Sequence, residues 1–250
     1  MHRILLYKTG ETHPALVPAI GDYEAWFARV LGDRVTLEMH FAVGKPRHTL
    51  AGYDGMVITG SPRSLVDGEV EPWMDDAAAF VRQAADAGVP VLGVCFGHQL
   101  VGYAYGGRVR TNPLGWEVGT VDVALTDAGA RDPLFAGLPP RIRVNQSHRD
   151  EVGALGPDTR ILAAGAHTPH QAIAVGDHVR GVQFHPEIDA VTIQRIIEHR
   201  RLILTSDATR RARADYCVDT LIARAQNTPD AERVLVNFVD HFIRHATVAA

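Results

Sequence analysis

The first half of the chain alternates short runs of β-branched and aliphatic residues with longer amphipathic stretches. This alternation is typical of a parallel sheet wrapped by helices, because successive parallel strands are joined by helical crossovers. Strands are predicted at residues 3–7, 35–40, 56–59 and 89–94, and helices at residues 21–31 and 75–87. The sequence therefore predicts an α/β fold whose sheet is mostly parallel and flanked by helices.

The second half of the chain has a different pattern of apolar and polar residues. Short alternating segments separated by Gly, Pro and Asp predict antiparallel strands added to the core, at residues 118–125, 141–144, 161–164 and 171–175. The pattern then becomes helical at residues 191–204, 216–225 and 231–245. No repeat or linker is visible, so we predict one domain over residues 1–250, with a core at about 1–190 and a helical C-terminal extension at 191–250.

Charge and cysteine content narrow the choice of partners. The formal net charge is -4 and the sequence pI is about 6.3, which argues against binding to nucleic acid or to an anionic membrane. Two cysteines, Cys95 and Cys217, are too few for a disulfide framework and indicate a reducing, cytoplasmic location. The first apolar run soon meets Lys8 and Gly10, so neither a signal peptide nor a membrane span is expected.

The sharpest motif is Gly93–Gly97, with Cys95 at its centre, which follows the apolar strand 89–94 and opens a predicted helix. A tight strand-to-helix turn of this kind is a nucleophile elbow, and it requires small residues on both sides of the nucleophile. The helix N-terminus favours a thiolate at Cys95 and places the N–H of Phe96 beside a developing oxyanion. A small buried cysteine in a glycine-rich turn is the alternative interpretation.

A thiol nucleophile needs a base, and the apolar strand that ends in residues 181–187 supplies His185 and Glu187. On an extended chain these two side chains project to the same side. Glu187 would then accept the Nδ1 proton and leave Nε2 facing the sulfur. Taken alone, the tripeptide that they form with Pro186 is more often a surface turn, but its placement after a strand favours a catalytic role.

Four segments in this order resemble the class I (triad) glutamine amidotransferase family: residues 58–62, 93–99, 145–150 and 181–187. The resemblance implies a flavodoxin-like fold, a γ-glutamyl substrate, no cofactor and a triad of Cys95, His185 and Glu187. It also implies an oxyanion hole and a glutamine pocket built by the remaining segments. Gly60, Ser61 and Phe96 are the predicted oxyanion donors, and the predicted substrate-binding residues are Gln99, Ser147 and His148. Ser147 and His148 match the family segment that binds the glutamine backbone through main-chain groups.

Other polar clusters have simpler explanations. The pairs His241/His245 and His167/His170 have ligand-like spacing, but they lack a completing set of ligands, so helix surface and turn are favoured and no metal is expected. Core packing suffices for Cys217. The C-terminal arginines predict a solvated helical face rather than a docking site for an anion, and they are Arg200, Arg201, Arg210, Arg211 and Arg213.

Three functions remain open from the sequence. The first is a free-standing enzyme that hydrolyses glutamine or a γ-glutamyl peptide through a glutamyl thioester; the motif details favour stand-alone members such as γ-glutamyl peptidases. The second is the glutaminase subunit of a complex that passes ammonia to a separate synthetase. The third is a non-catalytic binding or regulatory module, which the intact triad disfavours.

Overall fold

The computed structural model describes residues 1–44, 49–207 and 217–243. Its main sheet has nine strands in the order β2-β1-β3-β4-β11-β10-β9-β6-β7. These strands are β1 His2–Lys8, β2 Val35–Phe41, β3 Gly55–Ile58, β4 Val91–Val94, β6 Glu117–Leu125, β7 Arg141–His148, β9 Thr159–Ala164, β10 Ala172–Val175 and β11 Val179–Val182. A separate two-stranded sheet pairs β5 Arg108–Thr111 with β8 Asp150–Ala154.

The sheet is parallel in one half and antiparallel in the other. β2, β1, β3, β4 and β11 pair in parallel, whereas β11, β10, β9, β6 and β7 pair antiparallel. Strand β11 is the junction, because it is parallel to β4 on one side and antiparallel to β10 on the other. The predicted α/β fold with an added antiparallel segment is therefore confirmed.

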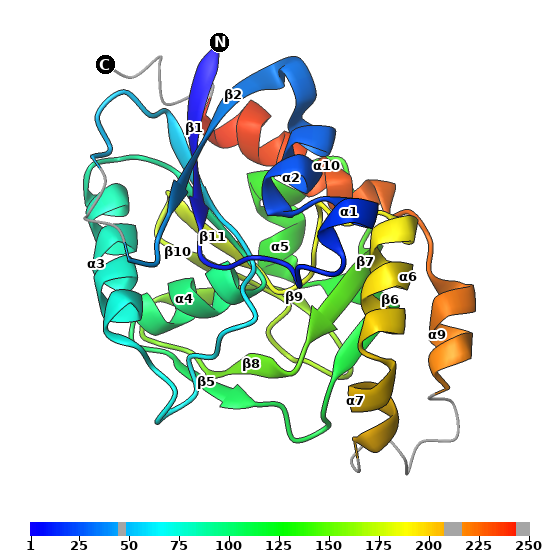
Figure 1. The fold of residues 1–250 in the computed structure, drawn as a ribbon. Helices are drawn as coiled ribbons and strands as arrows, with labels where there is room; N and C mark the ends of the chain where they lie inside the picture. The colour runs from blue at the N-terminus through cyan, green and yellow to red at the C-terminus, as the bar shows by residue number, and fades with distance from the viewer. Residues whose placement is uncertain (45–48, 208–216, 244–250) are drawn as a thin grey trace.

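Helices cover both faces of the sheet (Figure 1). The α-helices are α1 Val17–Ile20, α2 Tyr23–Leu31, α3 Pro72–Asp86, α4 Phe96–Ala104, α5 Asp127–Arg131, α6 Ala190–His199, α7 Arg201–Ser206, α9 Val218–Arg224 and α10 Pro229–Asn237. Short 3-10 helices span Gly32–Arg34 and Pro133–Phe135, and a π-helix spans Phe238–Ile243.

The hydrophobic core consists of two clusters, one on each face of the sheet. On β1, Ile4 and Leu6 pack with α2, α6 and α10, whereas Leu5 and Tyr7 pack with α3 and α4. Because successive side chains of a strand point to opposite faces, β1, β3, β4, β10 and β11 contribute to both clusters. The central strands β3 and β4 are buried along their whole length, as expected for a parallel sheet with helices on both sides.

Several predicted boundaries change in the structure. The predicted strand 141–144 continues to His148, because the motif residues 145–148 pair in register with β6. The strands β5 and β8 were not predicted. The predicted helix 191–204 is two helices that meet at Arg200, and the last predicted helix becomes a π-helix after Asn237.

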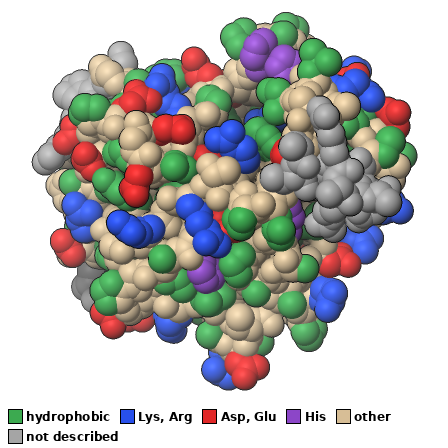
Figure 2. All heavy atoms as spheres, turned by 90° about the horizontal axis from the view of Figure 1, so that it is seen from below, with side chains coloured by type: hydrophobic (Ala, Val, Ile, Leu, Met, Phe, Trp, Pro, Cys, Tyr) green, Lys and Arg blue, Asp and Glu red, His purple; other side chains and the backbone are tan. Residues whose placement is uncertain are grey.

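Charges of both signs are distributed over the surface. Lys and Arg side chains are interspersed with Asp and Glu on the face drawn in Figure 2. In the described ranges, no helix combines the length and the apolar character that a membrane crossing requires.

In the turn from β4 to α4, the backbone at Gly93 lies close to the backbone at Gly97. A substitution at Gly93 therefore tests this packing. A Cβ added at Gly93 would lie 2.2 Å from the carbonyl oxygen of Gly97. The Gly93→Ala substitution should therefore lower the free energy of unfolding by about 2 kcal/mol or more, measured by chemical denaturation. Gly153→Ala is the control, because the atoms nearest to its Cβ would be side-chain atoms of the half-exposed Arg110 and not backbone atoms. Equal stability of the two variants would contradict this packing.

Candidate active site

Two adjacent parallel strands deliver Cys95 and His185 to the same edge of the sheet. Val94 pairs with Val182 at the ends of β4 and β11, and the N–H of Cys95 donates to the carbonyl of Val182 at 2.9 Å. Beyond those ends the chain continues to Cys95 on one strand and to His185 on the other. The carboxyl edge of a parallel sheet is where α/β proteins place their ligand sites.

The backbone at Cys95 has the conformation of a nucleophile elbow. Cys95 has φ 54° and ψ -102°, a region that residues with a side chain rarely adopt, and α4 begins at the next residue, Phe96. Such strain is retained where the surrounding structure enforces it and is common at active sites. The amide N–H groups of the first helical turn have no intrahelical acceptor, so they remain available to an anion beside the sulfur.

His185 and Glu187 form a buried ion pair. Nδ1 of His185 lies 2.7 Å from Oε1 of Glu187, and both side chains are almost inaccessible to solvent. Burial alone would lower the pKa of His185, but the charges of Glu187 and Cys95 and hydrogen bonds to both raise it to about 10. The imidazole is therefore held as an imidazolium between a carboxylate and a sulfur.

The two residues pair in a way that differs from the prediction. Strand β11 ends at Val182, and the segment from His185 to Glu187 is a turn and not extended chain. Asn145 on β7 holds this turn: its carbonyl accepts from the N–H of His185 at 2.9 Å, and its Nδ2 donates to the carbonyl of Ile188 at 2.9 Å. The first residue of the predicted 145–150 motif thus positions the histidine.

The loop after β3 lies beside the imidazole of His185. A Cβ at Gly60 would lie 3.3 Å from Cε1 of His185, so the backbone of Gly60 approaches the imidazole closely. Thr9 fixes this loop, because its Oγ1 donates to the Gly60 carbonyl at 3.1 Å and its own carbonyl accepts from Ser61 Oγ at 3.0 Å. The structure therefore brings the predicted oxyanion residues Gly60 and Ser61 to the edge that holds Cys95.

A cavity of about 560 Å³ opens over these groups. Cys95 and His185 line it together with Tyr23, Ser61, Ser147 and Arg200. Apolar side chains form another part of the wall and include Leu16, Trp26, Phe41, Val43, Ile196 and Ile203. The size lies in the usual range for small-molecule sites, and the mixture of apolar walls with a few polar groups is typical of them.

Arg200 is the residue of this site that the sequence reasoning missed. It was predicted on a solvated helical face, but it is half-buried and turns into the cavity, with its guanidinium stacked 4.8 Å above the Trp116 ring. Its Nη1 donates to the carbonyl and hydroxyl oxygens of Ser147. The sequence signal that could have identified Arg200 is its spacing: it follows the buried Ile193, Ile196 and Ile197 at helical intervals and so lies on the same, inward face.

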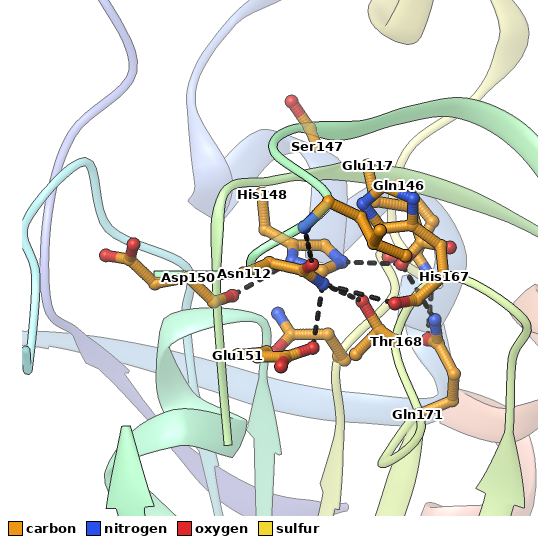
Figure 3. Close-up of polar contacts among 12 residues, drawn as sticks. Asn112, Glu117, Gln146, Ser147, His148, Asp150, Glu151, His167, Thr168 and Gln171 are labelled. Atoms are coloured by element: carbon orange, nitrogen blue, oxygen red, sulfur yellow. Dashed lines mark hydrogen bonds and ion pairs between the residues drawn. The ribbon is translucent and has the colours of Figure 1, made fainter. Parts of the chain in front are cut away.

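Ser147 and His148 point to opposite sides of β7 (Figure 3). Ser147 lines the cavity, whereas the buried His148 contacts Glu117 through Nε2 at 3.0 Å and the carbonyl of Asp150 through Nδ1 at 2.9 Å. Gln171 also donates to Glu117, at 2.9 Å. The side chain of His148 therefore belongs to a buried polar cluster behind the site, and the substrate contact predicted for this segment through its main-chain groups stays a prediction.

Gln99 also lies away from the cavity. Its Nε2 donates to the carbonyl of Asp150 at 2.8 Å and to Oε1 of Gln183 at 3.3 Å, and the side chain is buried. The first turn of α4 rotates this side chain toward β8 instead of toward Cys95. Gln99 therefore connects α4 to β8, and its predicted contact with the substrate stays a prediction.

The remaining predicted clusters lie elsewhere. His167 and His170 lie in a loop, as the turn interpretation predicts. His167 contacts the carbonyl of Gly115, and His170 contacts the carbonyl of Val152. Cys217 is exposed immediately before α9, which corrects its predicted core position. Arg201 is an exposed surface residue, paired with Glu198 and Asp219. His245, Arg210, Arg211 and Arg213 lie outside the described residues.

Comparison with known proteins places this geometry in a family. Residues 31–200 match the family model described as glutamine amidotransferase class-I. The chain is 34% identical over 182 residues to GMP synthase (glutamine-hydrolyzing) from Thermomicrobium roseum; the match covers 73% of this chain but only 32% of that protein. It is also 34% identical over 145 residues to a GMP synthase (glutamine-hydrolyzing) subunit from Saccharolobus solfataricus, covering 58% of this chain and 72% of that one.

Solved structures show the same fold at low sequence identity. A glutamine amidotransferase from Thermotoga maritima aligns with a TM-score of 0.72 at 20% identity, covering 100% of this chain and 99% of the other. A glutamine amidotransferase from Methylobacillus flagellatus aligns with a TM-score of 0.73, also at 20% identity, covering 96% of this chain and 95% of that one. With the family match over residues 31–200, the fold and the motifs agree: this chain belongs to the class I glutamine amidotransferase family.

Proposed function

We propose that this chain hydrolyses the γ-amide of glutamine or of a γ-glutamyl compound through a thioester on Cys95. The observation that carries the proposal is the placement of Cys95 in a strained elbow, on the same cavity as an imidazole that is paired with Glu187 at 2.7 Å. Nucleophile, base and orienting carboxylate are the three parts that acyl transfer by a thiol requires.

In the first half of the reaction, the thiolate of Cys95 attacks the γ-carbonyl carbon. The oxygen of that carbonyl becomes an oxyanion, which accepts hydrogen bonds from the N–H of Phe96 and from the loop at Gly60 and Ser61. The imidazolium of His185 then donates its Nε2 proton to the leaving nitrogen. The carbon–nitrogen bond breaks, the amine or ammonia departs, and a γ-glutamyl thioester remains.

In the second half, neutral His185 accepts a proton from water while the water oxygen attacks the thioester carbonyl. Collapse of that intermediate breaks the carbon–sulfur bond and releases glutamate with the thiolate restored. Glu187 stabilises the imidazolium each time it forms. Because Glu187 is fully buried and its Oε2 has no hydrogen-bond partner among the described residues, the imidazolium is its main electrostatic compensation.

A second candidate function is delivery of ammonia to a separate synthetase. It is favoured by similarity to proteins named as glutamine-hydrolyzing GMP synthase subunits, from Pyrococcus abyssi and Saccharolobus solfataricus, of which the match covers 66% and 72%. A subunit that hydrolyses glutamine within a larger enzyme would hand its ammonia to a partner. The hydrolytic chemistry at Cys95 is the same in both candidates.

The nucleophile assignment predicts a selective loss of turnover. Cys95→Ala should reduce glutamate release from glutamine by about 10³-fold or more, measured by a coupled glutamate assay, because no other group replaces the thiolate. The matched control is Cys217→Ala, since Cys217 is an exposed cysteine outside the cavity. Labelling by a diazo-ketone glutamine analogue, followed by mass spectrometry, should mark Cys95 in the control. Retained turnover in Cys95→Ala would refute the mechanism.

The charge on Glu187 predicts the protonation of His185. NMR titration should show that the His185 ring stays protonated through neutral pH and loses its proton near pH 10. The Glu187→Gln substitution should lower this pKa. Because the folded-state pKa exceeds the unfolded value of about 6.5, the pair contributes fully to stability below pH 6.5. That contribution is lost as the pH rises through about 10. Glu198→Gln, an exposed carboxylate on α6, should leave the titration unchanged.

The two candidate functions differ in partner dependence. A free-standing hydrolase should release glutamate at the same rate alone and in extract, whereas an ammonia-delivering subunit should copurify with an ATP-using synthetase that accelerates glutamate release. Affinity purification of the Cys95→Ser protein from its native cells tests this directly, and the same purification with an unrelated bait is the control. Recovery of no synthetase, together with full activity of the isolated chain, would favour the free-standing hydrolase.

A further inference from the structure

Three described cations of the Lys and Arg type line the cavity, and their surroundings differ. Lys8 is neutralised by Asp22 at 2.7 Å and by Glu24 at 2.6 Å. Arg63 pairs with Glu71. Arg200, in contrast, has no carboxylate partner within residues 1–44, 49–207 and 217–243. It is thus the one of these three cations that no carboxylate among the described residues neutralises.

Arg200 is nevertheless held in a defined position. It lies at the junction of α6 and α7, where its N–H donates to the carbonyl of Ile196 and its carbonyl accepts from Leu204. The Trp116 ring supports one face of the guanidinium, and Ser147 accepts from Nη1. Fixing a long side chain in this way removes the entropic cost of ordering it when a ligand binds.

The donors of Arg200 are only partly used. Nη1 donates to Ser147, whereas Nε and Nη2 have no acceptor in the parts of the chain that the structure describes. Nε and Nη2 form one edge of the guanidinium fork, which matches the two oxygens of a carboxylate. Burial lowers the pKa of Arg200, and the charges of Tyr23 and Cys95 offset this only in part.

We propose that Arg200 binds the α-carboxylate of the γ-glutamyl substrate and so selects substrates that carry this group. The proposal rests on the proposed hydrolysis at Cys95, since both residues line one cavity. The glutamyl group carries one anionic group, its α-carboxylate, beside a cationic α-amino group that the guanidinium would repel. The oxyanion of the reaction has its own donors in the backbone at Phe96 and Gly60. The α-carboxylate is therefore the anion that remains for Arg200.

A pair of ligands isolates this interaction. L-glutamine and 4-aminobutanamide share the amide and the amino group, but only glutamine has the α-carboxylate. Wild-type protein should prefer glutamine in kcat/KM, and Arg200→Gln should raise KM for glutamine by about 10- to 100-fold while leaving 4-aminobutanamide unchanged. Arg200→Lys should recover part of the preference, because it restores the charge without the fork.

Arg201→Gln is the matched control, because Arg201 is the neighbouring arginine and pairs with Glu198 and Asp219 on the surface. It should leave both substrates unaffected. Equal losses for glutamine and 4-aminobutanamide in Arg200→Gln would show that Arg200 acts on Cys95 or on folding, and would overturn the proposal. An unchanged preference for glutamine would overturn it as well. Thermal unfolding of each variant separates misfolding from loss of binding.

Calorimetry separates this proposal from the proposed hydrolysis. In the Cys95→Ala background, glutamine should bind more tightly than 4-aminobutanamide, and Arg200→Gln should remove the difference without any turnover. If the wild-type protein releases no glutamate but this binding pattern is present, the hydrolysis fails and the role of Arg200 holds. If glutamine does not bind, or binds no better than 4-aminobutanamide, the role of Arg200 fails whatever the activity.

Discussion

The parallel pairing of β4 with β11 is the constraint on which the site depends. Two segments far apart in the sequence become neighbours there, and their register places Val94 opposite Val182. Each strand then has a single continuation: a glycine-lined turn that raises Cys95, and a turn anchored by Asn145 that presents His185. A shift in that register would separate the sulfur from the imidazole, because each residue is fixed to its own strand by short connections.

The sequence pattern was sufficient for most of the fold because its signals are local. Buried parallel strands are continuous apolar runs, and the turn at Cys95 demands glycine at positions where a side chain would meet backbone, as the 2.2 Å approach at Gly93 demonstrates. The proximity of His185 to Cys95 was predictable from the common edge of a parallel sheet. The shape of the His185–Glu187 segment was not, because a tight turn brings these two side chains together as effectively as an extended chain.

The side chains of Gln99, His148 and Arg200 could not be placed from the sequence, because each has a partner on a distant segment. The carbonyl of Asp150 on β8 accepts from Gln99, and Glu117 on β6 contacts His148. Arg200 and Arg201 are adjacent and chemically identical, yet one stacks on Trp116 inside the cavity and the other pairs with Asp219 outside. No local sequence pattern specifies a partner such as Trp116. In the sequence the two arginines differ only in their position around the helix, which places Arg200 on the face of the buried isoleucines.

Part of the cavity wall lies outside the stretch of chain that the family model matches. The family match covers residues 31–200, which contain Cys95 and the histidine turn, whereas Tyr23 and Trp26 precede it and Ile203 follows it. Substitutions at Tyr23, Trp26 or Ile203 would therefore change the wall of the cavity without changing Cys95 or His185.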